Sequence, residues 1–545
     1  MKKKPLWLGV MATSLTLVLA ACGSSSSSAS KTQTINRMSK DVIATMDPQM
    51  ATDAISGQVL QDTGAGLLRY DGKKLQADVA KSLPKVSKDK KTYTYTLRPG
   101  TKWSDGKTVT AKDFVYSWRR LVDPKTKSEY AYIASGIKNA DAITAGKKAP
   151  STLGVKATGK YTFQVTLERV MPYFNKMITL QVFNPVEKST VDKYGKKFAT
   201  SSKTLTFNGP YTLSKWNGSS NTWTETKNPK YWNAKNVHVG KIKTQVVKDT
   251  TTALNLYQDG KLDDAVISGD TASQMRNNAD YNTVEQGRTT YLEMNAKRVP
   301  ALGNEKIREA MSLAINRKEF IKKVLGDGSK PISQVVPEGL FSNDKTGEDF
   351  ATAASKKYAS ESDYDVKKAT KLYKEGLKEL GTDHVQFTLL GDDTDVAKKT
   401  SEYLIGAWTK ALPGIKVTNK SVPFKTRVQL SLDHQADVVV SSWQADFPDA
   451  ISFLDLFTTG NSYNMGEWSS AKYDADIKAS KTTDAADVQK RWDDLKDADE
   501  TLAGQQGVIG LYQTGEAHLT KKTIKHMPYS PGNMINFVGT TNKAK

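Results

Sequence analysis

The hydrophobic pattern changes from a strand period to a helix period near residue 100. In KTYTYTLRPGTKWSDG, Tyr93, Tyr95 and Leu97 alternate with polar residues, which predicts a half-buried strand followed by turns. In TAKDFVYSWRRLVDP, apolar residues recur at helical spacing, and Thr110 with Asp113 has the order of a capping box. A helix that stops before the proline is therefore expected.

A second helix pattern lies in IREAMSLAINRKEFIKKVLGDG. Its apolar stripe consists of Ile307, Ala310, Met311, Ala314 and Ile315. This spacing predicts one helix that faces the core and ends at the glycine.

From about residue 385, strand and helix patterns alternate. The strands are VQFTLL, IKVTNKSV and ADVVVSSW, and the helices are DVAKKTSEYLIGAWTKAL and FKTRVQLSLDHQ. This order predicts a parallel sheet covered by helices, in which ligands bind beyond the carboxyl ends of the strands. SSWQADF lies at that position. The folded part, roughly 510 residues, is long enough for two or three domains.

The first residues have the pattern of a secretory signal peptide, expected over 1–21. Three lysines precede an apolar run that is shorter than the roughly 20 residues needed to cross a bilayer. The sequence LAAC resembles the bacterial lipobox, in which the cysteine sulfur takes a diacylglycerol, so Cys22 is the expected lipidation site. A secreted chain with a stray thiol is the weaker alternative, because a single cysteine forms no internal disulfide. The serine-rich residues 22–34 predict a flexible tether.

The chain is strongly basic, with 79 Lys and Arg against 58 Asp and Glu and a net charge of +21. Such a surface attracts polyanions. The lysines are spread over many segments without a nucleic-acid-binding motif, so we expect no nucleic-acid partner. Anionic wall polymers or lipid headgroups fit such a surface better than nucleic acid does, and a surface that only keeps the protein soluble is the favoured interpretation.

No motif supports catalysis. The five histidines are too far apart for a zinc-protease motif, and no G-x-S-x-G elbow occurs. GTKWSDGKT has five residues between its glycines, where a phosphate-binding loop has four. We therefore expect no enzyme activity, no metal and no cofactor.

Five segments resemble solute-binding protein family 5, the oligopeptide-binding proteins of bacterial ABC importers. They are TMDPQMATDAISGQVLQDTGAGLLRYDG, YTYTLRPGTKWSDGKTVTAKDFVYSWRRLVDP, NGPYTLSKWNGSSNTWTETKNPKYWN, VPALGNEKIREAMSLAINRKEF and ADVVVSSWQADFPDAISFLDLF. The resemblance implies an α/β, bilobal fold of the periplasmic-binding-protein type (class II, cluster C) with an extra inserted domain. It also implies the domain limits: domain I at 35–72, 200–288 and 501–545, domain II at 73–199, and domain III at 289–500.

In this family an extended peptide lies between two lobes that close about a hinge, and pairs with strand-like protein backbone on both sides. The matching segments here are Ser56-Gly57-Gln58 and Ser442-Trp443-Gln444. Asp446 matches the aspartate that accepts hydrogen bonds from the peptide's α-ammonium. The alternative for Asp446 is a helix N-cap before PDAISFLDLF.

Trp443, Phe424 and Tyr130 match the aromatic pocket walls of the family, although aromatic side chains more often fill a core. Val440 and Ala397 occupy the positions where some members hold the peptide's carboxylate with an arginine and a histidine. This departure predicts tolerance of longer peptides, or a carboxylate bound by another lysine.

The leading hypothesis is a monomeric, lipid-anchored receptor on the extracellular face of a cell membrane, expected to be Gram-positive. It would capture oligopeptides and deliver them to an ABC permease with its ATPase. Two alternatives remain open: a peptide-pheromone receptor on the same scaffold, and a surface adhesin whose binding weakens with salt. An exported hydrolase is not supported by any motif.

Overall fold

The computed structural model describes residues 32–356 and 363–543. Cys22 and the residues before it lie outside the described residues, as does most of the predicted tether. Residues Gln33–Lys545 form one compact unit with its own hydrophobic clusters, so this unit is expected to fold without the preceding residues. No helix within the described ranges is long and apolar enough to span a membrane. The domain limits inside the unit stay predictions.

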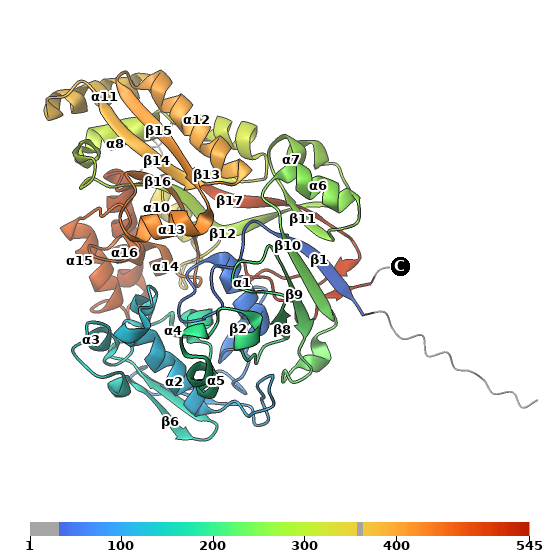
Figure 1. The fold of residues 1–545 in the computed structure, drawn as a ribbon. Coiled ribbons are helices and arrows are strands. Elements are labelled where there is room, and N and C mark those ends of the chain that lie inside the picture. The colour runs from blue at the N-terminus through green and yellow to red at the C-terminus, as the bar shows by residue number, and fades with distance from the viewer. Residues whose placement is uncertain (1–31, 357–362, 544–545) are drawn as a thin grey trace, which may run out of the picture. The chain divides into compact units, whose positions relative to one another are not determined.

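An 11-stranded mixed sheet runs through this unit (Figure 1). Its order is β15 (Ile415–Val422), β14 (Val385–Asp392), β16 (Val438–Gln444), β12 (Tyr281–Met294), β17 (Val508–Thr520), β11 (Asp264–Ile267), β1 (Thr34–Ser39), β10 (Lys241–Val246), β9 (Thr222–Lys227) and β8 (Tyr211–Ser214), with β13 (Lys330–Pro331) on β17. The long strands β12 and β17 pair antiparallel, with an irregularity between Glu285 and Thr289. They connect the β14–β16 part of the sheet to the β1–β11 part.

The predicted β-α-β-α-β order from residue 385 is confirmed. β14 is parallel to both β15 and β16, and α12 (Asp395–Ala411) and α13 (Phe424–Leu432) connect them. β14 pairs with β16 only at Val438 and Val439. Beyond Val439, the edge of β16 away from β12 has no strand partner among the described residues.

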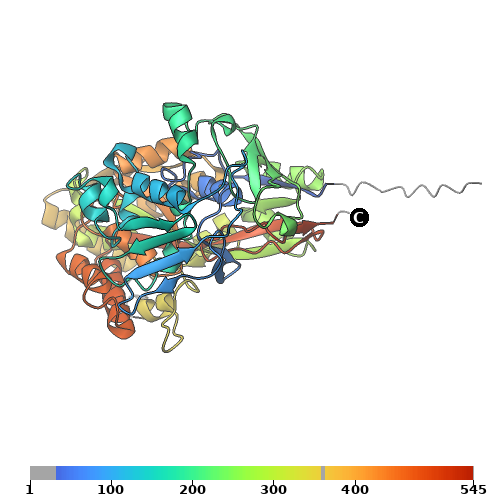
Figure 2. The same ribbon diagram turned by 90° about the horizontal axis from the view of Figure 1, so that it is seen from below.

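A separate sheet of order β4 (Lys85–Val86), β5 (Thr92–Thr96), β7 (Thr162–Thr166) and β6 (Val155–Gly159) lies in the predicted domain II. It sits at the end of the unit away from α11 (Val366–Leu380) and α12, and lies in front when viewed from below (Figures 1 and 2). Its helix α2 (Ala111–Val122) has the predicted capping box, in which the Thr110 N–H donates to Asp113 at 2.7 Å.

The prediction of one helix over 307–326 is wrong. α8 (Glu305–Leu313) ends early, and α9 (Arg317–Phe320) begins after Asn316, whose side chain accepts the N–H of Glu319. A π-helical turn, Ile321–Leu325, follows. An asparagine side chain that bonds a nearby backbone N–H favours a new helix start over continuation. The apolar stripe is buried as predicted.

The remaining helices lie on the faces and ends of the sheets. They are α1 (Ala54–Thr63), α3 (Ala140–Thr144), α4 (Phe174–Met177), α5 (Lys188–Tyr194), α6 (Thr250–Gln258), α7 (Gly269–Met275), α10 (Phe350–Ser355), α14 (Ile451–Leu454), α15 (Ala471–Lys481) and α16 (Val488–Gly504). Two short antiparallel pairs complete the elements: β2 (Leu68–Asp71) with β3 (Lys74–Ala77), and β18 (Ile524–Lys525) with β19 (Thr541–Asn542).

Candidate functional site

A cavity of about 440 Å³ lies where the open edge of β16 faces α1 and the C-terminal loop 529–537. Side chains from segments far apart in the sequence line it, among them Gln58, Tyr130, Phe424, Trp443 and Asp446. A cavity of this size falls in the range of about 300–1,000 Å³ that suits small ligands. Most of the predicted site residues are therefore brought together.

The backbone of β16 presents free groups to this cavity. The Ala445 N–H donates to the Gly287 carbonyl at 2.7 Å. The backbone N–H and C=O groups of Ala445, Trp443 and Ser441 therefore point to β12. Because N–H and C=O directions alternate along a strand, those of Ser442 and Gln444 point to the open edge. An extended chain has the geometry to add there as a new strand.

Asp446 lies just beyond the carboxyl end of β16. One of its carboxylate oxygens accepts a hydrogen bond from the Tyr130 hydroxyl, and its N–H donates to Ser452 Oγ at 2.8 Å. Burial raises the pKa of Asp446 to about 7, against the lowering effect of the hydrogen bonds from Tyr130 and Ser452. The helix-cap alternative is wrong, because α14 begins only at Ile451 and its first N–H bonds to Asp449.

Aromatic rings pack edge-to-face beside Asp446. The ring centroids of Trp443 and Tyr463 are 4.9 Å apart, and Tyr130 lies 5.9 Å from Tyr463 and 6.2 Å from Trp443. Trp443 Nε1 and the Tyr463 hydroxyl are buried without a hydrogen-bond partner among the described residues. Such groups favour a ligand or water that supplies acceptors. Sequence reasoning missed Tyr463, which follows no pattern that marks it.

The predicted strand-like backbone at Ser56-Gly57-Gln58 is wrong. These residues lie in α1, where Asp53 caps the helix and the Gly57 N–H donates to the Asp53 carbonyl at 2.9 Å. A backbone that uses its N–H groups within a helix cannot pair with a peptide strand. Ser56 and Gly57 are buried behind the cavity wall, and only Gln58 lines it.

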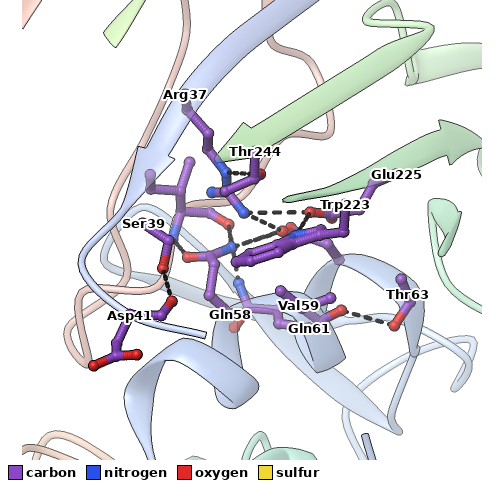
Figure 3. Close-up of polar contacts among 12 residues, drawn as sticks. Arg37, Ser39, Asp41, Gln58, Val59, Gln61, Thr63, Trp223, Glu225 and Thr244 are labelled. Carbon is purple, nitrogen blue, oxygen red and sulfur yellow. Dashed lines mark hydrogen bonds and ion pairs between the residues drawn. The ribbon is translucent and has the colours of Figure 1, made fainter. Parts of the chain in front are cut away.

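The Gln58 side chain holds the C-terminal loop against α1. Its amide donates to the Ile535 carbonyl at 3.0 Å and to Asp62, and its carbonyl accepts the Ile535 N–H at 2.7 Å. Near it, Arg37 reaches from β1 towards Thr244 and Glu225 (Figure 3).

The buried acids Asp62 and Glu225 share Arg37 at 3.4 Å each. Burial, followed by the charge of Glu225, raises the pKa of Asp62 well above its usual value. Burial also raises the pKa of Glu225, although Arg37 opposes this. The cluster carries two carboxyl groups against one guanidinium, so the two acids share a single positive charge, and burial makes ionisation of both unfavourable.

A second charged cluster also lines the cavity. His518 Nδ1 lies 3.1 Å from Asp264, and its Nε2 lies 3.4 Å from Glu516. Burial would lower the pKa of His518, but the two carboxylates raise it to about 10, so the imidazole is cationic at neutral pH. No motif in the sequence marks His518.

The remaining predicted positions differ in their role. Phe424 lines the cavity, with the Arg427 guanidinium 5.3 Å from its ring centroid. Val440 packs against the hydrophobic core around β12 and β14, and Ala397 lies in the first turn of α12. Neither is among the residues that line the cavity.

The model of the bacterial extracellular solute-binding proteins, family 5, matches residues 74–465, which is more than half of the chain. The chain belongs to this family. The predicted α/β binding-protein fold is confirmed by the solved structures of peptide-binding proteins that this chain resembles. This family-5 protein is 39% identical to the dipeptide-binding protein of Lactococcus lactis over 86% of each chain.

Two solved structures match the family-5 chain closely. One is Listeria monocytogenes OppA bound to peptide, with 38% identity, a TM-score of 0.89 and coverage of 95% of this chain and 100% of that one. The other is the pheromone receptor PrgZ, with 34% identity, a TM-score of 0.88 and coverage of 94% and 100%. The chain matches both structures over their full or nearly full length.

Proposed function

We propose that this family-5 protein captures oligopeptides between its lobes and hands them to an ABC permease. The observation that carries the proposal is the unpaired edge of β16, which faces the cavity and ends at Asp446. Main-chain pairing with that edge uses groups that every peptide has. The relatives described as dipeptide-binding and as OppA bound to peptide support the same ligand class.

In this proposal the peptide's α-ammonium binds the Asp446 carboxylate beside Tyr130. A charged hydrogen bond in a water-poor site is about twice as strong as a neutral one. The Trp443 and Tyr463 rings form the wall for the first side chain, and their unpaired polar atoms offer donors. The mechanism is binding and closure, with no bond made or broken in the peptide.

The lipid anchor at Cys22 belongs to the same proposal. It predicts that the exported protein stays with the membrane fraction and that Cys22→Ala releases it into the medium. Two acyl chains give stable attachment, whereas one is marginal. An unchanged membrane fraction for Cys22→Ala after a high-salt wash, which removes protein held by charge alone, would exclude this anchor.

Native mass spectrometry of the soluble chain from Lys31, before and after denaturing release, tests the ligand class. Heterogeneous bound peptides support the proposal, and their masses give the length range directly. Titration with one of these peptides and with its N-acetylated form then tests the ammonium site, with a loss of at least about tenfold expected on acetylation. An empty protein whose melting temperature no peptide pool changes would overturn the proposal.

A peptide-pheromone receptor is the second candidate, because PrgZ shares 34% identity with this chain. The same site serves both functions. One dominant bound mass that persists across different growth media favours signalling, whereas a broad ladder of masses favours nutrient uptake.

A further inference from the structure

The net charge of this protein is concentrated in one part of the chain. Residues 73–199 contain 26 Lys and Arg against 10 Asp and Glu, a net charge of +16 out of +21 for the whole chain. Residues 289–500 contain 30 against 34, a net charge of −4. A charge needed only for solubility has no reason to collect in one region.

Most of this charge is on the surface and unpaired. Nineteen lysines of residues 73–199 are exposed, against six exposed Asp and Glu. Within this fully described segment only Lys107 and Lys188 of those lysines lie within 4.0 Å of a carboxylate. The other seventeen lysines present uncompensated charge to the solvent.

The small sheet arranges part of this charge in a row that runs to the β4 edge. The pairing register places Lys85, Thr94, Gln164 and Lys156 in one row across β4, β5, β7 and β6, and paired residues share a face of the sheet. The row is polar at its centre, where Gln164 Nε2 donates to Thr94 Oγ1 at 3.2 Å, and basic at both edges.

The β4 segment, residues 81–91, adds exposed apolar side chains to the lysines. Leu83 is 52% exposed and Val86 is 44% exposed, and they are two of the five exposed large apolar residues in the described chain. Lys81, Lys85 and Lys88 surround them in the sequence KSLPKVSKDKK. Apolar side chains among lysines are typical of surfaces that bind the interface of an anionic membrane.

We propose that the β4 segment, at the edge of the small sheet, docks edge-on on an anionic lipid surface. Lys85 and Val86 point to opposite faces of the sheet, because Val86 pairs with the buried Tyr93, and both reach a membrane only at this edge. The lysines meet the headgroups, and Leu83 and Val86 enter the boundary between headgroups and acyl chains. A soluble polyanion would use the lysines but would gain nothing from the two apolar side chains, which is why the structure favours a membrane. This docking is independent of peptide binding and of the lipid anchor.

The test is flotation of the chain from Lys31 with vesicles of phosphatidylcholine, with and without phosphatidylglycerol. We expect binding only to the anionic vesicles, and loss of that binding at high salt. Because each lysine near such a surface contributes about fivefold to partitioning, Lys81→Glu/Lys85→Glu/Lys88→Glu should lower it more than tenfold. Leu83→Ala/Val86→Ala should lower it several-fold.

The matched control is Lys371→Glu/Lys374→Glu/Lys378→Glu on α11, in the region of net negative charge. It reverses the same number of exposed lysines, none of which has an ion pair within the described chain. It should change partitioning less than about twofold. If the β4 triple variant unfolds by circular dichroism, Lys88→Glu/Lys90→Glu in the β4–β5 turn replaces it.

Three results would overturn the proposal. The first is no preference for phosphatidylglycerol. The second is an equal loss in the α11 control, which would assign the effect to net charge alone. The third is full competition by soluble poly(glycerol phosphate) together with no effect of Leu83→Ala/Val86→Ala, which would assign the β4 segment to a wall polymer.

Discussion

At Asp446, burial and hydrogen bonding act in opposite directions on one carboxyl group. Burial is the larger effect and raises its pKa to about 7 in the free protein. A bound ammonium adds a positive charge at hydrogen-bond distance, which lowers the pKa again. Peptide binding is therefore coupled to the loss of a proton from Asp446 below neutral pH.

We expect peptide affinity to rise with pH up to about 7 and to fall again above about 8, where the peptide's α-ammonium deprotonates. Below pH 7 the slope approaches a factor of about 10 per pH unit, because one proton is released on binding. Asp446→Asn should bind at least about tenfold more weakly and lose the acidic limb. Isothermal titration calorimetry from about pH 5 to pH 9 measures both curves. A flat wild-type curve below pH 7 would contradict the role of Asp446.

At the scale of elements, β16 provides the binding edge because β14 leaves it after Val439. β14 continues beside β15 to Asp392, so β14 and β16 separate at the carboxyl end of the sheet. This is the position where ligands bind in open α/β sheets. The opposite wall is α1, a helix, so strand pairing is expected on the β16 side only.

Ser442→Pro should remove the backbone N–H of residue 442, which faces the open edge of β16. Proline is tolerated at an edge whose N–H makes no ladder bond, so the melting temperature should change little. Peptide affinity should fall at least about fivefold, the value of roughly one hydrogen bond. Ser442→Ala keeps the amide and serves as the control. Equal affinity of the two variants would show that the peptide does not pair with this edge.

Across the whole molecule, polar and aromatic contacts join the two sides of the cavity. Lys248 Nζ lies 3.1 Å from Asp41 and 2.9 Å from Asp393, which follows β14. Tyr173 stacks on Phe447 with ring centroids 5.3 Å apart. We infer that these contacts favour the closed cavity, because separating the segments that carry them would break both.

Lys248→Met should shift the protein towards the open form and speed up peptide release. A partly exposed ion pair is worth about 0–1 kcal/mol, so we expect a twofold to fivefold faster dissociation rate. Stopped-flow measurement with a fluorescent peptide gives this rate. Lys243→Met, an exposed lysine on β10 without an ion pair in the described chain, is the control. The pairing with Lys248 would be irrelevant to closure if both variants release peptide at the wild-type rate.

The sequence determined the features that depend on neighbouring residues. The alternation of patterns after residue 385 predicted the parallel strands, and Thr110 with Asp113 predicted the start of α2. The position of Asp446 beyond a parallel strand was also readable, because strand ends and ligand sites coincide in such sheets. The break at Asn316 was missed, because a local side-chain bond outweighed a continuous apolar stripe.

Only the tertiary structure decided which distant residues share the site. Arg37 meets Glu225 from a position 188 residues away, and Ile535 meets Gln58 across 477 residues. The edge of β16 is open because β14 stops pairing with it after Val439. No residue pattern within β16 indicates this. Propensity and periodicity act over a few residues, whereas burial, charge pairing and the open edge arise from chain segments that meet only in the folded protein.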